Sequence, residues 1–157
     1  MMFIIIELFI HHVFQLLYYL FLCETKIHRM KTTQEYITAA HSADLQWRKD
    51  LDFYKEEINI FKKRLEEIAF KNTSKDIKLM ISHFENQFII NLTVIDEINH
   101  LINLKEDKIA ADIKENAVAF EHRSIAYLSE VKGQVEIFTK LYASLKKEFN
   151  SFMSQVL

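Results

Sequence analysis

The chain has 157 residues, the length of one ordinary domain, and 50% of them are hydrophobic, so it can bury a core. It contains no proline and a single glycine, Gly133, which argues against sheets with tight turns and against glycine-rich phosphate loops. Its 20 basic and 22 acidic residues form no basic stripe, which argues against a nucleic-acid partner. We therefore expect an all-α protein with few, short connections, and the lone Cys23 is typical of a reducing compartment.

Residues 1–31 differ in character from the rest of the chain. Positions 3–22 form an apolar window that, as a helix, would cover about 30 Å of bilayer hydrocarbon. The window is a poor signal peptide, because no positive charge precedes it and no small-residue cleavage site follows it. It is interrupted by four polar residues, Glu7, His11, His12 and Gln15. The window predicts a membrane anchor.

The residues after this window support two different interpretations. The basic residues Lys26, Arg29 and Lys31 would leave the rest of the chain in the cytoplasm, tethered to the inner face of the membrane. Alternatively, translation starts at Met30, because Thr32-Thr33-Gln34-Glu35 is a capping-box pattern that begins a helix of its own. In that case residues 1–31 are a misassigned start, and in both cases residues 32–157 form the helical bundle.

Three long helices are predicted from apolar residues that recur in alternating steps of four and three, the heptad pattern of helices packed side by side. Two turns, at Asn72-Thr73-Ser74 and at residues 103–107, separate them. The fold class is therefore all-α, an antiparallel, coiled-coil-like bundle. The predicted helices cover residues 33–71, 75–103 and 107–155.

Two polar residues within these helices bear on the packing. Asp44 is expected on the outer face, paired with Arg48, because Ala43 is taken as the seam residue with a local unwinding before Trp47. Asn91 lies within the second seam, where a lone asparagine is more often a register device than an active-site group.

The predicted lengths leave the end of the third helix beyond the hairpin of the first two. Either the chain bends at Gly133 and makes a fourth helix, or a second copy covers the overhang, and we favour a homodimer. The expected self-association residues form one apolar face of the overhang: Phe138, Tyr142, Leu145, Phe149 and Phe152.

Catalytic and metal-binding patterns are scarce. There is no Gly-x-Ser-x-Gly, P-loop or Cys-x-x-Cys motif, so we expect no enzyme and no cofactor. Di-iron bundles use two Glu-x-x-His motifs, and this chain has one, Glu97-Ile98-Asn99-His100. Asp96, Glu97 and His100 are the only plausible metal cluster, and an exposed polar face is the stronger interpretation.

Three stretches carry a resemblance to a family: Leu51-Asp52-Phe53-Tyr54-Lys55, Phe84-Glu85-Asn86-Gln87-Phe88 and Leu145-Lys146-Lys147-Glu148-Phe149. Over residues 36–155 the chain resembles uncharacterised helical-bundle proteins from flavobacteria and their relatives. The resemblance implies a bacterial helical bundle and carries no known activity. The first functional hypothesis is thus a non-enzymatic scaffold or interaction protein that self-associates through its heptad seams, and another helical protein is the alternative partner. The alternatives are a membrane-tethered bundle and a metal-binding bundle.

Overall fold

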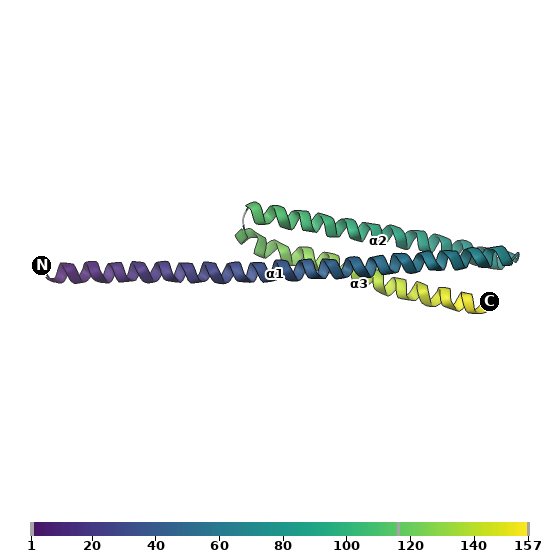
Figure 1. Cartoon of the computed structure of the whole chain (residues 1–157), viewed down its shortest axis with the longest axis horizontal. Helices are drawn as coiled ribbons and strands as arrows, with labels where there is room; N and C mark the ends of the chain where they lie inside the picture. The colour runs from purple at the N-terminus through teal and green to yellow at the C-terminus, as the bar shows by residue number, and fades with distance from the viewer. Residues whose placement is uncertain (1, 116, 157) are drawn as a thin grey trace. The chain divides into compact units, whose positions relative to one another are not determined.

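The computed structural model confirms the all-α fold. It describes the backbone of residues 2–115 and 117–156, and the side chains of residues 11–28, 31, 34–114 and 129–156. The chain forms two compact units, Met1–Ala40 and His41–Leu157. The helices of the described backbone are α1 (Met2–Lys71), α2 (Lys75–Glu115) and α3 (Ala117–Val156), as Figure 1 shows.

The turn between α1 and α2 lies where the sequence predicts it. After α1 ends, the backbone N–H of Asn72 donates to the carbonyl of Ile68 at 3.0 Å, and Nδ2 of the same residue donates to the same carbonyl at 3.0 Å. These bonds satisfy a carbonyl that the helix end would leave unpaired. The backbone N–H of Lys78 donates to the carbonyl of Ser74 at 3.1 Å, and Asp76 lies in the first turn of α2, where its charge favours the helix dipole.

In the second unit all three helices contribute to one core, and their directions follow from ring contacts. Tyr54 and Phe61 of α1 lie against Tyr142 and Phe149 of α3, at ring-centroid distances of 4.8 and 4.7 Å, so α1 and α3 run the same way. Phe149 also lies 5.3 Å from Phe88 of α2. The helix α2 runs in the opposite direction, because positions 48 and 61 of α1 meet positions 106 and 88 of α2. Met153 belongs to the core although it lies off the predicted seam. The other core residues occupy predicted heptad positions: Leu51, Ile58, Phe61, Leu65, Ile68, Ile81, Phe84, Phe88, Ile95, Ile98, Ile102, Val131, Val135, Phe138, Tyr142, Leu145, Phe149 and Phe152.

The structure corrects the predicted helix ends. The helix α2 continues through residues 103–107 to Glu115, and α1 begins at Met2 rather than at residue 33. Capping residues alone do not stop a helix when neither glycine nor proline follows them, and apolar spacing carries the helix onward. The fourth helix is also absent from the described backbone, since α3 passes through Gly133 without interruption.

The greater length of α2, which continues to Glu115, overturns the expected overhang. With 41 residues in α2 and 40 in α3, the two helices match in length, so α3 ends level with the start of α2. All five residues assigned to self-association are buried within the chain's own core: Phe138, Tyr142, Leu145, Phe149 and Phe152. That assignment was wrong, because α1 and α2 already cover these side chains.

Gly133 offers a test of the continuous α3. A Cβ built on Gly133 meets nothing within 4 Å, and its φ is not positive. We expect Gly133→Ala to raise the free energy of unfolding by about 0.5–1 kcal/mol, because alanine loses less backbone entropy in a helix. Urea unfolding measures the change. The reverse substitution on the same helix, Ala143→Gly at an exposed site, is the matched control and should cost a similar amount. A loss of stability in Gly133→Ala would show that α3 bends there.

The predicted membrane window of residues 3–22 begins in residues 3–10, whose side chains lie outside the described set. Within the part of the chain that is described, no helix has a stretch both long and apolar enough to cross a membrane.

Candidate functional site

The main hollow of the second unit is a groove between α2 and α3. It holds one cavity of about 390 Å³ and a second of about 480 Å³, and His83 and Glu148 line both. Three aliphatic side chains that line the first cavity remain more than half exposed: Ile90, Ile137 and Leu141. We call this surface the α2/α3 groove. In this groove exposed apolar side chains border a cavity of ligand size.

Charge is distributed unevenly along the α2/α3 groove. Asp76, His83 and Glu148 lie in the part nearer the first turn, whereas the remaining lining of the first cavity is uncharged. This uncharged lining includes Gln87, Asn91, Val94, Gln134 and Ser144. The groove therefore offers apolar and amide contacts along most of its length, a surface that suits a packed side chain better than an ionic ligand.

A buried ion pair joins α1 to α2. Lys105 Nζ donates to Asp44 Oδ1, and the two residues are only 4% and 1% exposed. The ammonium of Lys105 also lies 5.3 Å from the ring centroid of Trp47, a cation–π contact. Two opposite charges in the core that hydrogen-bond each other restrict how α1 can slide along α2, since any shift of register leaves both unpaired.

The carboxyl of Asp44 is electrostatically perturbed. Burial raises its pKa above the usual value of 3.8, and the hydrogen bond and charge of Lys105 oppose that rise. Glu106 also raises this pKa through its like charge, whereas Arg48 lowers it. Desolvation is the largest of these effects, so the pair contributes a constraint on packing more than a gain in stability.

Polar side chains surround this pair toward the surface. Arg48 donates to Glu106 Oε2 at 2.9 Å and to the side-chain oxygen of Asn103 at 2.7 Å. His41 Nδ1 lies 3.5 Å from Glu106 Oε1. These contacts extend the α1–α2 register outward from the buried pair into half-exposed positions, where each ion pair is worth about 0–1 kcal/mol.

A second polar cluster joins α1 to α3. Glu57 accepts a hydrogen bond from the Tyr142 hydroxyl at 2.8 Å and another from Lys146 Nζ at 2.6 Å. Burial raises the pKa of Tyr142, and the hydrogen bond to Glu57 raises it further, so the phenol stays protonated and acts as a donor. The cluster is therefore a polar contact between α1 and α3.

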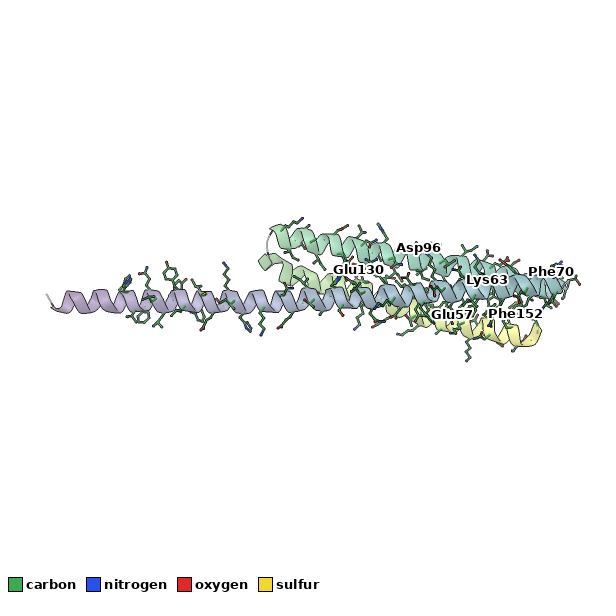
Figure 2. The ribbon with its side chains drawn as sticks, viewed as in Figure 1. Glu57, Lys63, Phe70, Asp96, Glu130 and Phe152 are labelled. Carbon is green, nitrogen blue, oxygen red and sulfur yellow. The ribbon has the colours of Figure 1, made fainter. Side chains whose placement is uncertain are left out.

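The candidate metal ligands are not assembled into a site. Asp96, Glu97 and His100 are exposed on α2, where Figure 2 labels Asp96. Asp96 Oδ1 lies 3.2 Å from Lys55 Nζ. Among the described residues, no group of three or more His, Cys, Asp or Glu side chains could hold a metal ion. A lysine beside a carboxylate competes with a cation for it, so these three residues are an exposed polar face.

Asn91 also differs from its predicted role. Its Nδ2 donates to the carbonyl of Gln87 in the same helix at 2.8 Å, and its side chain lines the α2/α3 groove. Asp44 and Lys105 instead make a polar contact between helices in the core. The prediction missed both residues, having placed Asp44 on the outer face and Lys105 in a turn.

The sequence did hold a signal for the missed residues. Ala40, Asp44, Trp47 and Leu51 follow one another in steps of four, three and four, with no unwinding. Lys105 follows Ile102 in the same alternation. Opposite charges at heptad core positions of two antiparallel helices are the mark of a buried pair. The corresponding signal for the groove was a set of apolar residues off the main seams, Ile90 in the second helix and Ile137 and Leu141 in the third.

Comparison with known proteins adds nothing to this description. No protein-family model matches the chain, and searches of curated proteins and of solved structures also found no match. The resemblance to bacterial helical-bundle proteins therefore stays a prediction.

Proposed function

We propose that the chain is a non-enzymatic helical scaffold that self-associates through the α2/α3 groove. The observation that carries this proposal is the set of exposed aliphatic side chains beside the first cavity, of which Leu141 is 64% exposed. Exposed apolar side chains that border a cavity are a common feature of protein–protein contact surfaces. Filling the groove with an apolar helix face would remove these side chains from water, at roughly 25 cal/mol for each Å² buried.

A second copy of the chain is a suitable occupant of the groove. In a two-fold dimer each groove faces its own equivalent, so an apolar strip meets an apolar strip. A two-fold axis passing near Leu141 places the two Glu148 side chains toward opposite ends of the contact. The like charges then do not face each other, and the uncharged stretch from Gln87 to Val94 forms the centre of the contact between the two copies.

The location of the protein is also a proposal. We place it in the cytoplasm at the inner face of the cell membrane, because Lys26, Arg29 and Lys31 follow the apolar window of residues 3–22. Exposure of the apolar side chains that are described in this window supports the proposal. The bundle would then lie on the cytoplasmic side of the anchor.

Sedimentation of the full chain over a range of protein concentrations tests self-association. We expect a dimer that dissociates on dilution. The variant Leu141→Lys should sediment as a monomer with unchanged helical content, because the charge would be buried in the contact. The control Ile60→Lys changes a residue of α1 that is 51% exposed and does not line the groove, and it should sediment like the unmodified protein. A compact monomer at every concentration, or a dimer that survives Leu141→Lys, would contradict the proposal.

A further inference from the structure

The first unit contains an unusual run of exposed apolar side chains on α1. Every residue from Val13 to Leu22 except Gln15 is a large hydrophobic residue that is 39–71% exposed. We call residues 13–22 the apolar segment. It lies in the purple part of α1, where side chains project on both sides of the ribbon (Figure 2).

The apolar segment is hydrophobic around the whole helix. Ten consecutive residues make nearly three turns at about 3.6 residues per turn, so these side chains point in every direction around the axis. A partner helix covers one stripe of such a surface and leaves the other sides in water. A lipid bilayer surrounds a helix completely, which makes lipid the occupant that matches this distribution.

The length of the apolar segment and its flanking charges suit a bilayer. At about 1.5 Å per residue it rises about 15 Å, close to half the hydrocarbon thickness of about 30 Å. Lys26 lies one helical turn beyond Leu22 and is exposed, and Lys31 is exposed further along. Lysines near a membrane surface are attracted to anionic headgroups by about 1 kcal/mol each.

We propose that the apolar segment inserts into the hydrocarbon of a lipid bilayer, with Lys26 at the level of anionic headgroups. The inference deepens the proposed location at the membrane and does not depend on the α2/α3 groove. Its basis is an all-round apolar surface in the first unit, whereas the groove is a one-sided surface in the second unit.

Flotation of the full-length protein with lipid vesicles tests the insertion. With vesicles of phosphatidylcholine and phosphatidylglycerol, the unmodified protein should rise with the lipid on a density gradient. The double variant Leu17→Asp, Phe21→Asp places two carboxylates on one face of the segment and should stay with the unbound protein. The matched control Phe70→Asp changes a residue of the same helix that is 92% exposed, and it should float like the unmodified protein.

Two further variants test the role of Lys26 and separate membrane insertion from self-association through the α2/α3 groove. Lys26→Gln should weaken binding about fivefold on vesicles that contain phosphatidylglycerol and leave binding to pure phosphatidylcholine unchanged. Leu141→Lys should float normally, so failure of the groove proposal would not affect this result. The inference is overturned if the unmodified protein stays unbound with both vesicles. It is also overturned if the double variant floats as well as the unmodified protein. The same holds if the double variant no longer self-associates in lipid-free solution but its flotation is unchanged.

Discussion

Replacing Lys105 by methionine is expected to lower the free energy of unfolding by about 3–5 kcal/mol, because the charge of Asp44 would then be buried without a partner. Methionine keeps the length and most of the volume of the lysine, so the loss reports the missing charge and not a cavity. Urea unfolding followed by circular dichroism measures it. The matched control is Lys55→Met, which breaks the exposed pair with Asp96 and should cost about 0–1 kcal/mol.

The same variant should acquire a characteristic pH dependence. Burial already raises the pKa of Asp44, and loss of Lys105 removes the interactions that oppose the rise. A carboxyl whose pKa is higher in the folded state than in the unfolded state keeps its proton up to a higher pH when folded. Below pH 3.8, the ordinary pKa, the carboxyl is protonated in both states and its burial costs little. The cost grows as the pH increases through the window up to the raised pKa. The deficit of Lys105→Met relative to the unmodified protein should therefore be small in acid and should increase as the pH rises.

A double variant separates the burial of a lone charge from the value of the pair. Replacing Asp44 by leucine together with Lys105→Met should recover most of the lost stability, because no unpaired charge remains in the core. Asp44 contributes to the pH dependence of the unmodified protein's stability, and the double variant should lack that contribution. If the single variant shows a loss that is the same at every pH, or if the double variant is as unstable as the single one, Asp44 is not the buried partner of Lys105.

Replacing Phe149 by alanine is expected to destabilise the folded chain by about 3–5 kcal/mol, because it empties the centre of the aromatic core. Phe149 is 0% exposed, and its ring centroid lies within 5.3 Å of those of Phe61, Phe84 and Phe88. It touches α1 and α2 at once, so the cavity would weaken contacts between all three helices. Urea unfolding gives the change in free energy.

The Phe149→Ala substitution also tests whether Phe149 lies in the chain's own core or in an interface between two copies. Phe70→Ala, at a side chain that is 92% exposed, is the control and should change stability by less than about 0.5 kcal/mol. Because Phe149 lies within the chain's own core, the difference between Phe149→Ala and the unmodified protein should be independent of protein concentration. A Phe149→Ala variant that keeps its stability and helical content but loses its dimer would show that the residue belongs to an interface between copies.

Most of the core was predictable from the sequence because it depends on local periodicity. Alternating steps of four and three place Leu51, Ile58 and Ile95 on the inner faces whatever the connections between helices. The first turn was also predictable, since Asn72 and Ser74 supply end and start signals in direct succession. The second turn was not, because Asn103 and Asp107 resemble caps in sequence yet lie within α2.

The predicted self-association site depended on where the second helix ends. Ending the second helix at residue 103, whereas α2 continues to Glu115, left Phe138 to Phe152 without partners and turned core residues into an expected interface. It also removed Lys105 from the seam and so hid the pair with Asp44. The groove beside Ile90 and Leu141 was missed for a different reason, because its apolar residues lie off the strongest heptad stripe.

The amino-acid sequence by itself determined the helical class and which side chains turn inward, because turn-forming residues are scarce and hydrophobic spacing acts over neighbouring turns of helix. Only the tertiary structure decided where α2 ends, which lysine neutralises Asp44 and which apolar side chains stay in water. Those outcomes depend on contacts such as the one between Asp44 and Lys105, which are 61 positions apart in the chain. Such contacts form only once the helices are aligned, and the heights at which residues meet then follow from the lengths of both helices.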